Sequence, residues 1–134
     1  MDDERDNSQF CIRASSAIVR LVAERAGVSI SELADRDRFP FAILAFTVSD
    51  LISQMIGTPW DKEKIMFESI SSITAVDLFG VDYAGEIGKV ADAYNGLAGE
   101  GGPVRALGLS VRAWIDDPSS NGLDKIAAGY RATR

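Results

Sequence analysis

Apolar residues recur along this chain with the three- and four-residue spacing of amphipathic helices. In residues 8–26 they form a single stripe: Phe10, Ala14, Ala17, Ile18, Leu21 and Val22. Similar stripes follow in residues 60–79, 82–97, 104–115 and 121–130. No stretch alternates between apolar and polar residues as a half-buried strand does. The pattern therefore predicts an all-α fold, a single-domain bundle of about six helices.

Glycine, proline and capping residues predict where the first helices begin and end. Gly27 is expected to end the first helix in a left-handed conformation, with Val28 making the apolar contact that accompanies such a cap. Ser29 and Glu32 have the spacing of a capping box, which predicts a short helix after them. Pro40 is expected to open the next helix as a first-turn residue.

The helix predicted for residues 40–56 is expected to be central, because its beginning is apolar around nearly the whole circumference. Gly80 is expected to end the helix of residues 60–79, although the serines and threonines of residues 69–74 could also be read as a strand. Asp82 and Asn121 are expected to cap the two helices that follow them. Residues 8–134 are predicted to form one helical domain, and the acidic residues 1–7 a disordered tail.

The composition fits a globular domain and removes several kinds of catalytic site. Of the 134 residues, 46% are hydrophobic and 25% are charged, as in ordinary globular proteins. The chain has no histidine and one cysteine, Cys11, which excludes an internal disulfide, histidine or four-thiolate zinc sites, and catalytic triads that need histidine. Cys11 lies off the apolar stripe, so we expect a partly exposed spectator thiol. The absence of these catalytic residues favours a binding function over catalysis, and no cofactor is predicted.

The charge balance bears on partners and location. Fourteen Lys and Arg against 20 Asp and Glu give a net charge of -6, and such a surface repels phosphate backbones overall. The acidic first residues differ from the basic start of a secretory signal, and the longest apolar stretch is too short to span a bilayer. We expect a cytoplasmic protein without a membrane segment. Abundant Arg, Ala and Gly indicate a bacterial source.

The leading functional hypothesis is a small binding or assembly protein, acting through protein-protein interaction or as a homo-oligomer. Large apolar residues are concentrated around the two central helices, and some fall off the predicted stripes. Exposed apolar residues that cluster mark interaction surfaces. The residues expected to form such a surface are Phe39, Phe41, Trp60, Phe67 and Leu109.

An alternative hypothesis is a DNA-binding transcriptional regulator that uses residues 19–38. The stretch VRLVAERAGVSISEL, residues 19–33, resembles the helix-turn-helix of TetR-like and related bacterial repressors. The resemblance implies a second helix that enters the major groove. The residues that it places at DNA are Arg20, Arg25, Ser29, Ser31, Arg36 and Arg38. Because Glu32 and Asp35 would bring negative charge to the same surface, a plain corner between two helices is the other explanation.

A third hypothesis is an enzyme that depends on magnesium or on an anion. Asp82 and Glu86 share a helical face, and the glycine-rich loop with Gly101 and Gly102 precedes a helix start. Free N–H groups at such a start could hold an anion, with Arg105 adding charge. The loop lacks the lysine and hydroxyl residue of a Walker loop. A mobile connection and solvated acidic faces are the competing explanations.

Overall fold

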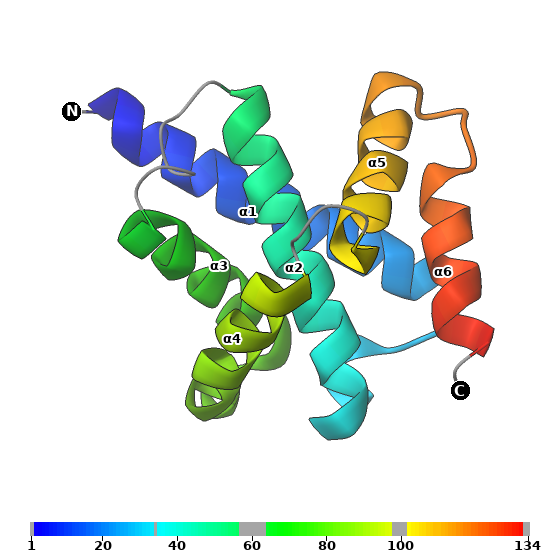
Figure 1. Ribbon diagram of the computed structural model, residues 1–134, viewed down its shortest axis with the longest axis horizontal. Helices are drawn as coiled ribbons and strands as arrows, with labels where there is room; N and C mark the ends of the chain where they lie inside the picture. Colours follow the sequence, from blue (N-terminus) through cyan, green and yellow to red (C-terminus); the bar gives the residue numbers. More distant parts are fainter. Residues whose placement is uncertain (1, 34, 57–63, 98–101, 133–134) are drawn as a thin grey trace.

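The computed structural model describes residues 2–33, 35–56, 64–97 and 102–132, with side chains except at residues 2–6, 35–36, 64–67, 103 and 131–132. These ranges contain helices and no strand, which confirms the predicted all-α bundle. The elements in chain order are α1 (Asp2–Arg25), η1 (Ile30–Glu32), α2 (Asp35–Met55), α3 (Lys64–Phe79), η3 (Val81–Glu86), α4 (Ile87–Leu97), α5 (Pro103–Asp116) and α6 (Gly122–Ala132), where η denotes a 3-10 helix (Figure 1). None of the helices in these ranges is both long and apolar enough to cross a membrane.

Helix α2 is the centre of the fold. All of residues 41–49 are buried, so this part of the helix has no face toward solvent. It packs against α1, α3, α4 and α5, and Figure 1 shows it running through the middle of the bundle. A fully buried Val, Leu or Phe side chain contributes roughly 1.5–3 kcal/mol to folding. The prediction of an apolar central helix is therefore confirmed.

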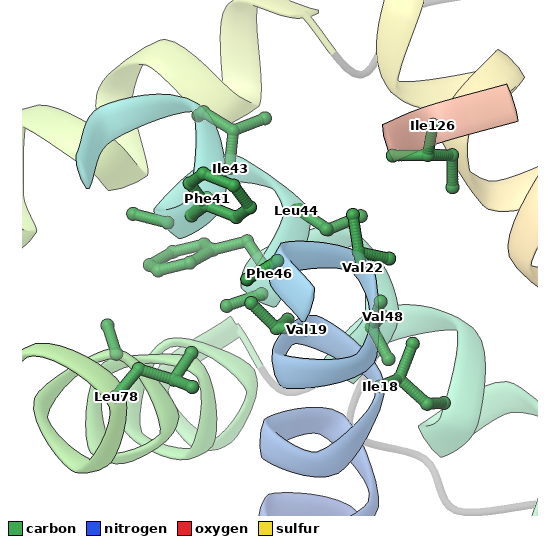
Figure 2. Packing of buried hydrophobic residues seen from close by; sticks show 14 of the residues in the cluster. Ile18, Val19, Val22, Phe41, Ile43, Leu44, Phe46, Val48, Leu78 and Ile126 are labelled. Atoms are coloured by element: carbon green, nitrogen blue, oxygen red, sulfur yellow. The ribbon is translucent and has the colours of Figure 1, made fainter. Parts of the chain in front are cut away.

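Helix α1 crosses α2 with a stripe of small and β-branched side chains. In Figure 2, Ile18, Val19 and Val22 of α1 lie beside side chains of α2. Of the predicted stripe only Ile18 and Val22 are buried, and Phe10 is exposed. The buried residues of α1 are Cys11, Ser15, Ser16, Ile18, Val19, Val22, Ala23 and Ala26. Side chains of this size allow the two helices to approach closely and pack without voids.

The two ends of α1 differ in how well the sequence predicted them. Gly27 has a φ of 72°, and its N–H donates to Glu24 O at 3.0 Å while Val28 N–H donates to Ala23 O at 2.9 Å. These two bonds form a Schellman motif, and Val28 is buried as predicted. At the other end, α1 begins at Asp2 and includes residues 2–7, for which the sequence indicated a disordered tail.

The connection from α1 to α2 corrects two predictions. Residues Ile30–Glu32 form one 3-10 turn, and Ser29 makes no side-chain cap bond, so the capping box is wrong. The Ser29 hydroxyl lies 3.2 Å from Ser31 Oγ instead. Helix α2 begins at Asp35 and contains Pro40 inside it, so Pro40 does not open the helix. Proline removes one backbone donor, and we infer that the burial of residues 41–49 outweighs that loss.

Helix α3 shows how a stretch rich in serine and threonine is accommodated. Ser72 Oγ donates to Glu68 O at 2.6 Å, and Thr74 Oγ1 donates to Ile70 O at 2.9 Å. These bonds to carbonyls four residues earlier satisfy the hydroxyls without leaving the helix. The helical interpretation is confirmed, and the strand alternative is wrong.

The end of α3 was predicted correctly, but the start of α4 was not. Gly80 ends the helix with a φ of 94°. Asp82 does not cap α4, because it lies inside η3, whose N-cap is Gly80. Helix α4 then starts at Ile87. Six residues of 3-10 helix, Val81–Glu86, thus take the place of the expected α-helical start.

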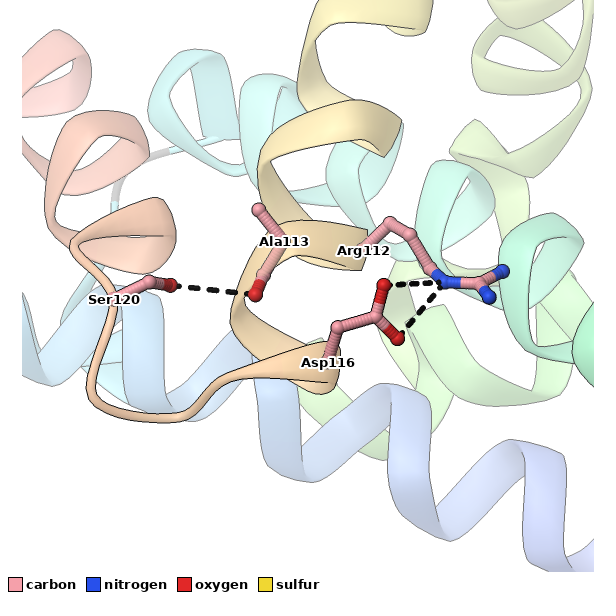
Figure 3. Close-up of polar contacts among 4 residues, drawn as sticks. All are labelled: Arg112, Ala113, Asp116 and Ser120. Carbon is pink, nitrogen blue, oxygen red and sulfur yellow. Dashed lines mark hydrogen bonds and ion pairs between the residues drawn. The ribbon is translucent and has the colours of Figure 1, made fainter.

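Helices α5 and α6 lie side by side and are joined by a short turn (Figure 1). In the turn, the N–H and the hydroxyl of Ser119 donate to Asp117 Oδ1 at 3.1 and 2.6 Å. These bonds hold the pKa of Asp117 below its ordinary value. Figure 3 shows Ser120 Oγ donating to Ala113 O at 3.4 Å, which ties the turn back to α5.

The closest approach of α5 and α6 is at Gly122, and it gives a stability prediction. A Cβ at Gly122 would collide with Ser110 O and would lie 3.2 Å from the Cβ and N of Trp114. We expect Gly122→Ala to lower the free energy of unfolding by about 1–3 kcal/mol, the usual cost of overpacking. Urea denaturation measures this effect.

The control for Gly122→Ala lies in the same helix. A Cβ at Gly129 would meet no atom within 4 Å, so Gly129→Ala is expected to be neutral or to stabilise by up to about 1 kcal/mol through helix propensity. Equal effects of the two substitutions would contradict the close helix contact at Gly122.

Candidate functional site

An apolar groove runs along the surface between α5 and α6, and we call it the α5–α6 groove. Its wide part is a hollow of about 570 Å³ at the end where α2 begins, within the size range of ligand sites, roughly 300–1,000 Å³. Its walls come from the start of α2, the end of α4, and α5 and α6. The lining residues are Phe39, Pro40, Ile43, Leu97, Ala106, Leu107, Ser110, Lys125, Ile126, Gly129 and Tyr130.

The groove continues toward the turn between the two helices. A smaller hollow of about 250 Å³ shares Ser110 and Lys125 with the wide part. It is also lined by Ser120 and Asn121 of the turn and by Gly122, beside the point where α6 touches α5. Together the hollows follow α6 from residue 122 to residue 130, which is about 12 Å at 1.5 Å per residue.

The packing of α6 explains why the groove is open. Helix α6 packs on α5 and α1, whereas α2 is covered by α1, α3, α4 and α5. At Gly122 the backbone of α6 lies against α5, but at Gly129 there is open space. Ala106, Ser110 and Gly129 are small residues, and they leave the space between the helices unfilled.

One aromatic pair fixes the wide end of the groove. The rings of Phe41 and Tyr130 stack with their centroids 4.4 Å apart, and Tyr130 Oη donates to Pro40 O at 3.1 Å. Burial raises the pKa of the Tyr130 phenol, so the phenol keeps its proton and its hydrogen bond. The C-terminal part of α6 is therefore attached directly to the start of α2.

Charge in the groove is confined to one side chain. Lys125 is the only ionisable cation among its lining residues, and it makes no ion pair within the described part of the chain. Lys125 is exposed beside a mostly apolar lining, a combination that suits an apolar ligand with one acidic group.

The interaction residues predicted from the sequence are only partly brought together. Phe39 is 37% exposed and lines the wide end of the groove, and Leu109 is 63% exposed and lines the narrow end. Phe41 is buried and belongs to the core, so its place on an exposed surface is a correction. Trp60 lies outside the described residues, as does the side chain of Phe67.

The stripe expected in residues 121–130 does not indicate that α6 lines a groove, although Ile126 within it is buried. Gly129 was not singled out, although a glycine within a helix is unfavourable by about 1 kcal/mol relative to alanine. The presence of a glycine within the helix in spite of this cost was the sign in the sequence that the space beside Gly129 is open.

The arginines expected at DNA do not converge on one surface. Arg20 Nη2 lies 3.4 Å from Asp77 Oδ2 of α3, whereas Arg25 Nε lies 3.2 Å from Asp124 Oδ1 of α6. Each pairs with a different neighbour of α1. Arg38 is half-buried, and the side chain of Arg36 lies outside the description.

The second helix implied by the repressor resemblance is not formed. Ser29 and Ser31 are exposed and belong to a single 3-10 turn. The helix after that turn is α2, whose residues 41–49 are buried in the core. A recognition helix must offer its side chains to the major groove, so the geometry of residues 19–38 is that of a corner between helices.

The residues of the third hypothesis are also separated. Gly102 is the N-cap of α5, Arg105 N–H donates to Gly102 O at 3.1 Å, and Gly101 lies outside the described residues. Glu86 Oε2 lies 3.5 Å from Lys89 Nζ, and Asp82 is exposed. Within the described ranges, no group of three or more carboxylate or thiol side chains is arranged to hold a metal ion.

Cys11 is buried, which corrects the expectation of a partly exposed thiol. Its Sγ donates to Ser49 O at 3.5 Å and lies 3.9 Å from Ser15 Oγ, while Ser49 Oγ donates to Ser15 Oγ at 3.3 Å. The cluster joins α1 to α2 in the core. The apolar stripe predicted from the sequence left Cys11 out, because the serines on the same face of the helix were not counted as core residues.

Comparison of the chain with family models, with curated proteins and with solved structures gives no match.

The buried thiol gives a prediction about pH. Burial raises the pKa of Cys11 from 9.0 to about 11, and the charge of Asp50 adds to the rise while the Ser15 hydrogen bond opposes it. The folded state therefore favours the protonated thiol, and this stabilisation is present below pH 9 and lost as the pH rises toward 11. We expect the wild type to lose on the order of 2 kcal/mol more than Cys11→Ala between pH 8 and 10.5.

Urea denaturation of both proteins at the two pH values provides the measurement. Because Tyr94 and Tyr130 are present in both, their titration cancels in the comparison. The same loss in wild type and variant would contradict the burial of the thiol.

Proposed function

We propose that this protein is a binding protein that takes an apolar helix of a protein partner into the α5–α6 groove. The observation that carries the proposal is the groove itself, which is elongated, apolar and supplied with a single lysine. Amphipathic helices bind in such grooves through apolar side chains at positions i, i+3, i+4 and i+7.

The length of the groove suits a helix better than a compact ligand. It follows α6 for about 12 Å, which corresponds to about two turns of a docked helix. Two turns present three or four apolar side chains on one face. The wide hollow beside Gly129 and Ala106 has room for the largest of these side chains.

The rim of the groove supports a protein partner. Phe39 and Leu109 are among the large apolar residues that the protein exposes, and they line opposite ends of the groove. A helix lying along the groove would cover both of them. Their removal from water would favour binding by about 25 cal/mol for each Å² of apolar surface covered.

Lys125 favours a negatively charged side chain on the partner near the middle of the groove. It lies where the wide and the narrow hollows meet, since it lines both. A glutamate or aspartate on the docked helix would pair with it at the edge of an apolar contact. Electrostatic pairs of this kind fix the register of a helix more than they raise its affinity.

A library of helical peptides randomised at i, i+3, i+4 and i+7 provides the probe. Peptides selected against the wild type are expected to bind Gly129→Leu at least tenfold more weakly, because the new side chain occupies the hollow. The matched control is Gly88→Leu in α4, since Gly88 is also exposed, helical and without an atom within 4 Å of a Cβ. Fluorescence anisotropy measures the affinities.

The outcomes separate the possible sites and partners. Equal binding to Gly129→Leu and Gly88→Leu would show that the peptides bind elsewhere, and it would contradict the proposal. Sedimentation velocity of the wild type tests the homo-oligomer: association that Gly129→Leu abolishes and Gly88→Leu retains would identify a second copy as the partner.

A further inference from the structure

A second hollow lies on the other side of α5, between α5 and α2. It has a volume of about 440 Å³, and Tyr94 of α4 lines it as well. Unlike the α5–α6 groove, it is lined by charged and polar side chains: Asp50 and Gln54 from α2, Arg105 and Arg112 from α5, and Tyr94. We call it the α2–α5 pocket.

Each of the two helices contributes one complete face to the pocket. Thr47, Asp50, Leu51 and Gln54 follow the spacing i, i+3, i+4 and i+7 along α2, and Arg105, Gly108, Leu109 and Arg112 follow the same spacing along α5. Residues with this spacing share one side of a helix. The helices approach at Gly108, where a Cβ would lie 3.7 Å from Thr47 Cγ2.

The α5 side of the pocket offers two guanidinium groups. Arg105 is exposed, and its side chain makes no ion pair or hydrogen bond within the described part of the chain. Arg112 Nε donates to both carboxylate oxygens of Asp116, at 3.2 and 3.1 Å. Figure 3 shows the two Nη atoms of Arg112 on the side away from Asp116, so these donors stay available to a ligand.

The α2 side offers acceptors. Asp50 is half-buried, and one of its oxygens, Oδ2, accepts a hydrogen bond from Tyr94 Oη at 3.4 Å. A carboxylate has about four lone-pair sites, so Asp50 can also accept from a ligand. Gln54 is exposed on the next turn of α2 and adds an amide with a donor and an acceptor.

We propose that the α2–α5 pocket binds a small oxyanion that also carries hydroxyl groups, such as a sugar phosphate or a sugar acid. Arg105 holds the phosphate or carboxylate through charge-assisted hydrogen bonds, and Arg112, at the other end of the α5 wall, donates to a hydroxyl. Asp50 accepts hydrogen bonds from the hydroxyls. The volume fits one such molecule, and the pocket shares only Leu109 with the α5–α6 groove.

The arrangement of charges excludes simpler ligands. The two arginines are seven residues apart on α5, about 10.5 Å along its axis, so they line the two ends of one wall. A bare anion pairs with Arg105 but has no hydroxyls for Asp50 and Arg112, and a neutral sugar has no charge to pair with Arg105. Only a molecule with both kinds of group matches the two walls together.

Isothermal titration calorimetry with ribose 5-phosphate and with gluconate tests the proposal. The two probes carry hydroxyls with a phosphate or a carboxylate, so the tighter one identifies the preferred anion. Inorganic phosphate lacks the sugar hydroxyls and ribose lacks the anionic group, so each is expected to bind at least tenfold more weakly. Arg105→Gln is expected to weaken the better probe roughly tenfold or more, since it removes a charged hydrogen-bond donor.

The control variant is Arg13→Gln, because Arg13 is also exposed, helical and unpaired among the described residues. It is expected to bind the probe as the wild type does, and circular dichroism checks that both variants are folded. Absence of binding by both probes at millimolar concentration would overturn the proposal. So would binding that Arg105→Gln leaves unchanged.

Discussion

The enclosure of α2 is the constraint on which the rest of the structure depends. A helix that is buried all round along residues 41–49 must be covered on every side, and α1, α3, α4 and α5 provide that cover. Dense packing inside proteins leaves little freedom in how these helices are placed. Helix α6 is different, because it rests mainly on α5 and α1 and touches α2 near the start of that helix, where Tyr130 packs on Phe41.

This arrangement explains why both hollows flank α5. Helix α5 approaches α2 at Gly108 and α6 at Gly122, and the helices separate away from these two points. On one side the gap is lined by apolar residues and Lys125, and on the other side by Asp50, Arg105 and Arg112. A single helix thus separates a groove suited to apolar side chains from a pocket suited to a polar anion.

The sequence predicted most of the fold because helices leave local signals. Gly27 and Gly80 ended their helices as expected, since a positive φ is easily adopted only by glycine. Errors arose where packing overrode local preference. Pro40 lies inside α2, and Asp82 lies inside a 3-10 turn in place of a capping position.

The candidate sites were harder to predict, because a hollow depends on how helices diverge. Nothing in the stripe of α6 shows that it touches α5 at Gly122 and stands away from it at Gly129. Arg105 was singled out with Gly101 and Gly102, but the structure places it in the same pocket as Asp50 of α2. That neighbour is 55 residues away in the sequence, so no local motif could have paired them.

The protection of α2 amides against hydrogen exchange tests the central role of this helix most directly. If residues 41–49 form an enclosed core, their amides exchange only through global unfolding and show the slowest rates in the protein. Their free energy of exchange is then expected to equal the free energy of unfolding measured with urea. Exchange of these amides at the rates found for the exposed faces of α4 and α6 would contradict the enclosure of α2.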